Sequence, residues 1–203
     1  MRGWLGPSQR EKLEPVPYQL KRGQAVLRDC EKSDIPAITA IYGHAVRHSR
    51  STFEIDPPKE REMAVRREAL VSKGYPYIVA VIDDALAGYA YASPYRPRPA
   101  YDGTVEDSVY VHKDFRGQGL GRSLLQRLIA DAEVRDFRQM VAVIGDSTNA
   151  VSIRLHESLG FALVGTFRSV GWKHEQWLDT VLMQRALGLG DTAPPVLHET
   201  RER

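Results

Sequence analysis

The hydrophobic positions of this chain switch repeatedly between the spacing of a strand and that of a helix. Short alternating or continuous apolar runs predict strands at residues 25–29, 78–82, 86–92, 105–111, 140–144, 161–166 and 177–184. Apolar residues at helical spacing, or long charged stretches, predict helices at residues 35–45, 60–73, 122–135 and 149–158. Asp83-Asp84 between two of the strands predicts a hairpin turn.

This order of elements predicts one α/β (α+β) domain in which a mixed sheet carries helices on both faces. We place the domain at residues 25–187, between a polar, proline-containing leader at 1–24 that we expect to be flexible and a tail at 188–203 that contains Pro194-Pro195. No internal repeat or low-complexity tract interrupts it.

Composition and charge narrow the classes of function. The 203 residues are 42% hydrophobic and 27% charged, as in a globular protein, and 28 basic against 26 acidic residues argue against nucleic-acid or membrane-surface binding. Cys30 is the single cysteine, so neither an internal disulfide nor a cysteine metal cluster is possible, and the histidines show no metal-ligand spacing. No apolar run approaches the roughly 18 residues of a membrane span, and we expect a soluble cytoplasmic protein without a metal.

A glycine-rich segment, Arg116-Gly117-Gln118-Gly119-Leu120-Gly121, separates the strand at 105–111 from the following helix. Glycines permit positive φ and close approach, so successive backbone N–H groups can converge on one anion. The positive end of the helix dipole adds to this attraction. The segment therefore indicates a phosphate site, although a tight strand-to-helix connection without a ligand would look the same.

Together with Val109-Tyr110-Val111, this glycine segment resembles the acetyl-CoA signature of the GNAT N-acetyltransferases, and residues 149–161 resemble the second cofactor motif of that family. Residues 100–111 and 170–179 further resemble the branch that acetylates phosphinothricin and methionine sulfoximine. The resemblance implies a single-domain GNAT fold with a mostly antiparallel sheet, and a homodimer.

It also implies a function. Acetyl would pass from acetyl-CoA, bound as co-substrate, to the amino group of a small amino acid or analogue, of the phosphinothricin or methionine sulfoximine/sulfone type, by direct attack in a ternary complex. Two alternatives remain open at this point: a protein N-terminal or polyamine acetyltransferase, and a non-catalytic acyl-CoA-binding domain.

The residues expected to bind the cofactor follow from the two motifs. Backbone groups of the strand would hold the pantetheine, the glycine segment would cradle the pyrophosphate, and the start of the helix at 149–158 would complete the site. The set is Val109, Tyr110, Val111, Arg116, Gly117, Gln118, Gly119, Leu120, Gly121, Arg122, Asn149 and Ser152.

Glu106 is the candidate general base, because an amine largely protonated at neutral pH must lose a proton before it attacks a thioester. It could instead be an exposed strand carboxylate in an ion pair, and Asp107 is a weaker rival. His156, where many relatives in the family carry tyrosine, could protonate the departing thiolate or position the thiol. A histidine in a helix is more often structural, so both interpretations stay open.

The acceptor site is less well marked. A guanidinium fork suits a carboxylate or phosphinate, which makes Arg96 and Arg98 of the proline-rich loop candidates, although either could simply be solvated. Phe53 and Tyr91 could form walls, or equally belong to the core. The substrate-binding set is Arg96, Arg98, Phe53, Tyr91, Glu106 and Ser108.

Overall fold

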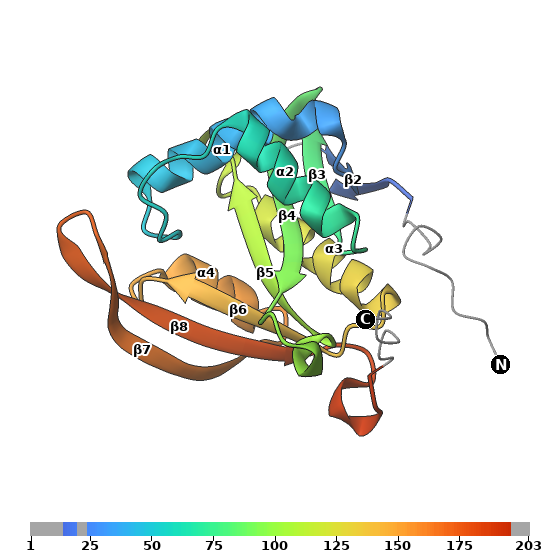
Figure 1. The fold of residues 1–203 in the computed structure, drawn as a ribbon. Coiled ribbons are helices and arrows are strands. Elements are labelled where there is room, and N and C mark those ends of the chain that lie inside the picture. The colour runs from blue at the N-terminus through green and yellow to red at the C-terminus, as the bar shows by residue number, and fades with distance from the viewer. Residues whose placement is uncertain (1–13, 20–23, 196–203) are drawn as a thin grey trace.

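The computed structural model describes residues 14–19 and 24–195, and a curved eight-stranded sheet forms its centre (Figure 1). The strands are β1 (Val16–Gln19), β2 (Gln24–Asp29), β3 (Tyr77–Ile82), β4 (Ala85–Pro94), β5 (Thr104–Val111), β6 (Gln139–Gly145), β7 (Ala162–Lys173) and β8 (Gln176–Ala186). Their order across the sheet is β1-β2-β3-β4-β5-β6-β8-β7, and β5–β6 is the parallel pair in an otherwise antiparallel arrangement. The predicted mixed, mostly antiparallel sheet is confirmed.

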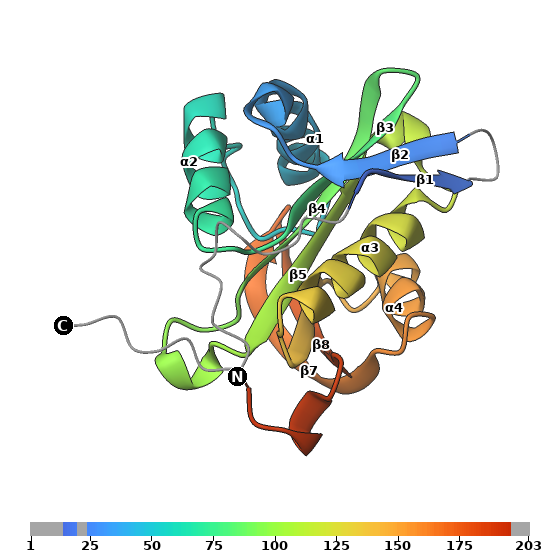
Figure 2. The same cartoon turned by 90° about the vertical axis from the view of Figure 1, so that its right-hand side faces the viewer.

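Helices cover both faces of this sheet, as Figure 2 shows from the side. The helices α1 (Ile35–His48) and α2 (Glu60–Val71) lie on one face, and α3 (Leu120–Val134) and α4 (Ala150–Glu157) lie on the other. Each face has its own apolar core. Leu124 and Leu128 of α3 pack with Ala90 of β4, whereas Ile38 of α1 packs with Tyr89 on the opposite face of the same strand.

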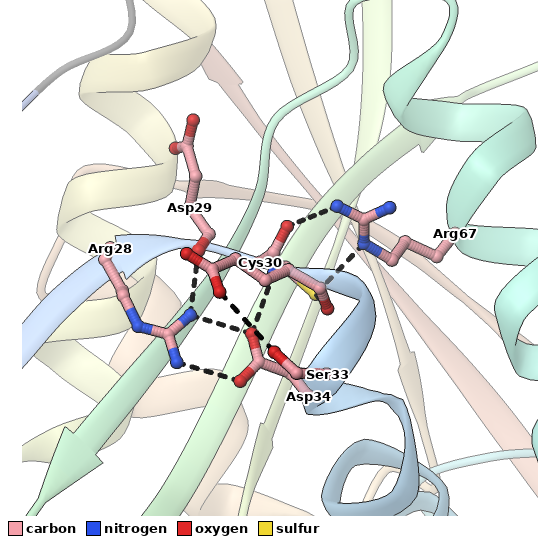
Figure 3. A network of polar contacts seen from close by, with 7 residues as sticks. Arg28, Asp29, Cys30, Ser33, Asp34 and Arg67 are labelled. Atoms are coloured by element: carbon pink, nitrogen blue, oxygen red, sulfur yellow. Dashed lines mark hydrogen bonds and ion pairs between the residues drawn. The ribbon is translucent and has the colours of Figure 1, made fainter.

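Polar contacts anchor the start of α1 to the strand before it and to α2 (Figure 3). The Arg28 guanidinium donates to both carboxylate oxygens of Asp34, at 2.7 and 2.8 Å, and Asp34 also accepts from the Glu31 backbone N–H at 2.7 Å. Arg67 of α2 donates from Nε to Cys30 Sγ at 3.3 Å and from Nη2 to the Cys30 carbonyl. These contacts hold the first strand-to-helix connection beside α2, and Cys30 is buried there.

Two elements differ from the sequence analysis. Val16–Gln19, within the segment treated as a leader, form edge strand β1 and pair with β2, while residues 1–13 and 20–23 lie outside the described residues. The strand predicted to end at residue 166 continues to Lys173 as β7. A bulge between Phe167 and Gly171 explains this miss, because it breaks the alternation that marks a strand.

The described residues were compared with the requirements of a membrane-spanning helix and of a metal site. None of their helices is long and apolar enough to cross a membrane. Within the same ranges, no group of three or more His, Cys, Asp or Glu side chains is arranged to hold a metal ion.

Candidate active site

The central feature of the site is the point where β5 and β6 stop pairing. The two strands pair from Thr104–Gln139 to Asp107–Ala142, and then diverge, although β5 continues to Val111 and remains paired with β4 (Figure 1). This divergence leaves backbone groups on one edge of β5 without a strand partner. A cavity of about 820 Å³ lies here, lined by residues of both strands.

The glycine segment forms one end of this cavity, at the start of α3. Gly117 and Gly119 have φ values of 75° and 96°, and a Cβ at either would have no heavy atom within 4 Å. Gly119 is the N-cap of α3, so the unpaired N–H groups of the first turn lie beside open space. This geometry suits an anion at the N-terminus of α3.

Helix α4 forms the wall opposite β5 and is fixed at both ends. Asn149 caps its N-terminus, its side-chain oxygen accepting from the Ser152 backbone N–H at 3.2 Å. At the other end Arg122 Nη1 of α3 donates to Ser158 Oγ at 2.5 Å. Arg122 lines the cavity, but this contact directs its guanidinium toward α4.

Glu106 lies on β5 inside the cavity, close to the last residue pair between β5 and β6. Burial is the main cause that raises the pKa of Glu106 to about 6, the negative charge of Asp107 adds to the shift, and the positive charge of Arg96 opposes it. A carboxylate whose pKa lies near neutrality is a stronger base than a carboxylate with an ordinary pKa. It therefore accepts a proton from an ammonium group more readily. This environment suits the predicted base and not the alternative of an exposed ion pair.

Asp107, the next residue along β5, points to the other face and pairs with His156 of α4. His156 Nε2 lies 3.1 Å from Asp107 Oδ2, and its Nδ1 lies 2.7 Å from the Ser152 carbonyl oxygen. Both partners can only accept, so the ring satisfies them when both nitrogens carry protons. Burial lowers the pKa of His156, but the hydrogen bond and charge of Asp107 outweigh it, and the pKa lies above its usual value. The two acceptor partners and the raised pKa thus favour the imidazolium form of His156, which is buried at the cavity wall.

Most residues expected to bind cofactor or acceptor line this one cavity. Those found there are Phe53, Tyr91, Glu106, Ser108, Val109, Tyr110, Val111, Arg116, Gly117, Gly119, Leu120, Gly121, Arg122, Asn149, Ser152 and His156. Gln118, Arg96 and Arg98 are not among the lining residues. Arg96 instead stacks its guanidinium 4.5 Å from the centre of the Tyr95 ring and donates to the Tyr95 carbonyl at 3.2 Å.

Sequence reasoning missed the part of the wall that comes from α1 and the loop after it. Tyr42, Ser49, Ser51 and Thr52 line the cavity, and the Tyr42 and Thr52 hydroxyls lie 3.2 Å apart. Serine and threonine in a loop carry no signal of their own, so nothing in the sequence singles them out. Asp107 was considered only as a rival base, and its partner lies 49 residues away along the chain.

Parallel strands that diverge beside a glycine-capped helix N-terminus, with a half-buried carboxylate at the point of divergence, are features of a class of acyl-group transferases. The chain belongs to the acetyltransferase (GNAT) family, whose model matches residues 41–161.

Individual relatives agree with this assignment over nearly the whole chain. A phosphinothricin N-acetyltransferase of Alcaligenes faecalis is 48% identical over 189 residues, which cover 93% of this chain and 96% of that protein. An L-methionine sulfoximine/L-methionine sulfone acetyltransferase of Pseudomonas paraeruginosa is 41% identical, covering 84% and 99%. The crystal structure of a GNAT superfamily phosphinothricin acetyltransferase of Sinorhizobium meliloti, in complex with acetyl-CoA, superimposes with a TM-score of 0.83 at 45% identity, covering 87% and 94%.

Proposed function

We propose that this protein transfers the acetyl group of acetyl-CoA to the amino group of a small amino acid or analogue of the phosphinothricin or methionine sulfoximine type. The observation that carries the proposal is Glu106, a carboxylate with a raised pKa placed where β5 and β6 diverge. The relatives that act on such compounds, at 41% and 48% identity, support the choice of acceptor.

The residues present fit acetyl-CoA. The open space above Gly117 and Gly119 and the N-terminus of α3 suit a pyrophosphate. The free edge of β5 beyond Asp107 offers backbone donors and acceptors to an extended amide chain such as pantetheine. When bound, acetyl-CoA supplies a thioester, an acetyl group already activated for transfer to a nucleophile. Because acetyl-CoA is a metabolite of the cell interior, we place the enzyme in the cytoplasm.

Glu106 would take the proton from the acceptor ammonium group, directly or through a water molecule, and leave a neutral amine. A backbone N–H near Val111 would polarise the carbonyl under attack. His156 would place positive charge, and a proton on Nδ1 or Nε2, at the wall where the sulfur leaves. Both of its nitrogens already have acceptor partners, which favours electrostatic stabilisation over proton donation.

The acceptor would lie beside Glu106 and Ser108, against the rings of Phe53 and Tyr91. The Tyr91 ring stacks on the Tyr77 ring, with 5.0 Å between their centroids, and this contact supports the wall. An amino acid also carries a carboxylate that needs a positive partner. Arg96, whose charge already reaches Glu106, is our candidate for that role together with Arg98.

A homodimer is part of the proposal. Strand β7 is the edge of the sheet, and large apolar side chains on β7 and β8 are more than half exposed. These side chains are Leu163, Val164, Phe167, Val170, Trp172 and Trp177. An exposed apolar surface along a free strand edge is typical of an interface, and a second copy of the chain is the partner we propose. Analytical ultracentrifugation should give twice the mass of one chain, and a monomer at micromolar concentration would contradict this part.

A thiol-release assay with acetyl-CoA tests the function. The acceptor panel should contain phosphinothricin, methionine sulfoximine, methionine sulfone, free methionine, spermidine and a peptide with a free N-terminus. We expect release with the first three compounds. Release only with the peptide or spermidine would favour the other acetyltransferase classes. A thermal shift with acetyl-CoA, combined with no release from any amine, would indicate a binding domain.

A further inference from the structure

One wall of the cavity comes from a loop that packs against distant strands. Ser49, Ser51, Thr52 and Phe53, between α1 and α2, all line the cavity that contains Glu106. The proposed acceptor would therefore contact this loop, and the contacts that hold the loop set the position of that wall.

Contacts to β7 and to the residue after β6 hold the loop between α1 and α2 in place. The buried Lys173, on β7, donates from Nζ to the Thr52 carbonyl oxygen at 2.7 Å. Arg50 Nε pairs with Asp146 Oδ2, just after β6, at 3.0 Å. The loop that follows α1 is thus attached to β7 and to the end of β6.

The tightest contact is between the Phe53 ring and Gly171 of β7. A Cβ atom built on Gly171 would lie 2.0 and 2.3 Å from two ring carbons of Phe53. On the other side, a Cβ on Gly145 would lie 3.4 Å from the same ring and 2.5 Å from the Arg50 carbonyl oxygen. The ring can occupy its place against β7 only because Gly171 carries no side chain, and the Arg50 carbonyl can approach β6 only because Gly145 carries none.

The bulge in β7 determines where Gly171 lies. Phe167 pairs with Thr180 and Gly171 with Leu178, so three residues of β7 face the single residue Asp179 of β8. The Asp179 carboxylate holds this irregular segment, accepting from the Ser169 backbone N–H at 2.9 Å and from Ser147 Oγ at 2.7 Å.

We infer that Gly171 is a positioning residue that sets the place of the Phe53 ring and thereby the selectivity of the enzyme among acceptors. The inference rests on the proposed function, since it names the wall that the acceptor contacts. Phe53 forms part of the wall of the cavity that contains Glu106, and Gly171 determines where its ring lies.

The variant Gly171→Ala tests this, with Gly165→Ala as a matched control. Gly165 is also on β7 at a conformation open to alanine, and its Cβ would have no atom within 4 Å. In Gly171→Ala the ring must move by about 1.5 Å to restore a normal carbon–carbon contact of about 3.5 Å. We expect the KM for the preferred acceptor to rise at least about fivefold and the ranking of acceptors to change, with the KM for acetyl-CoA within about twofold of wild type. Gly165→Ala should match wild type.

A second substitution separates displacement of the ring from general damage. Phe53→Ala in the Gly171→Ala background removes the clash, so the double variant should lose no more thermal stability than Phe53→Ala alone and share its acceptor ranking. Equal acceptor kinetics in Gly171→Ala and Gly165→Ala would overturn the inference while leaving the proposed function intact. A uniform loss for every acceptor and for acetyl-CoA would also overturn it. A wild-type protein that acetylates no acceptor would overturn the proposed function and the selectivity role together.

Discussion

The acid limb of the pH–rate profile should report the ionisation of Glu106. With a pKa of about 6, the carboxylate is about nine tenths ionised at pH 7 and about one tenth ionised at pH 5. At the ordinary pKa of 4.5 it would still be about three quarters ionised at pH 5. The acceptor amine stays protonated throughout this range, so kcat/KM should follow the ionised fraction of Glu106. We expect kcat/KM to fall about tenfold between pH 7 and pH 5, whereas an ordinary pKa would give a fall of only about a quarter.

The variant Glu106→Gln should lose this limb and at least about tenfold in turnover, because the amide accepts no proton. It should also be more stable than wild type at pH 7. The raised pKa means that the folded protein binds the proton more tightly than the unfolded chain, so ionised Glu106 destabilises the fold above about pH 6. The difference from the ordinary pKa corresponds to about 2 kcal/mol, which solvent screening of a partly exposed group reduces to about 1 kcal/mol. That gain corresponds to a Tm about 2–4 °C higher.

Three measurements check the reasoning. Thiol release gives kcat/KM between pH 4.5 and 8.5, differential scanning fluorimetry at pH 7 and pH 4.5 gives the stability change, and a thermal shift with acetyl-CoA shows that the cofactor site is intact. The stability gain should be present at pH 7 and much smaller at pH 4.5, where the carboxyl is protonated in the folded protein and about half protonated in the unfolded chain. Wild-type turnover in Glu106→Gln would refute the base assignment, and an acid limb near pH 4.5 in the wild type would refute the environment derived for it.

Further variants test the groups around Glu106. Arg96→Ala removes a charge that lowers the pKa of Glu106, so the acid limb of kcat/KM should move to higher pH, and an unmoved limb would contradict the contact. Gly119→Val places a branched side chain at φ 96°, and steady-state kinetics should show a KM for acetyl-CoA at least about tenfold higher with little change for the acceptor. Asp107→Ala removes the acceptor and counter-charge of the buried His156 ring and should lower the free energy of unfolding in urea at pH 6 by about 1–3 kcal/mol. Because the pKa of His156 is raised, the stabilisation by this pair should be full below about pH 6.5 and be lost as pH rises, a dependence that Asp107→Ala should abolish.

Elements with local signals were predictable from the sequence. Asp83 and Asp84 both adopt positive φ, as the predicted hairpin turn requires, and Gly160 follows α4 at φ 84°, a left-handed conformation typical of glycine after a helix. Strand β1 was missed for the opposite reason. Three of its four residues, Val16–Gln19, are exposed and one is a proline, so pairing with β2 creates the strand, and no pattern within the segment does.

The site, too, combines parts with a local sequence signal and parts that depend on contacts between distant segments. The glycine segment and the Asn149 cap involve only residues close together in the sequence and could be recognised along the chain. The walls that give the site its chemistry depend on contacts between segments far apart, such as His156 with Asp107 over 49 residues and Lys173 with the Thr52 carbonyl over 121. Each contact depends on where β5 and β6 stop pairing and where β7 bulges, and those points follow from the packing of the whole sheet. Acceptor choice is therefore the property least readable from local sequence, and substitutions such as Gly171→Ala, outside the two cofactor motifs and outside the cavity lining, should change it while the cofactor site stays intact.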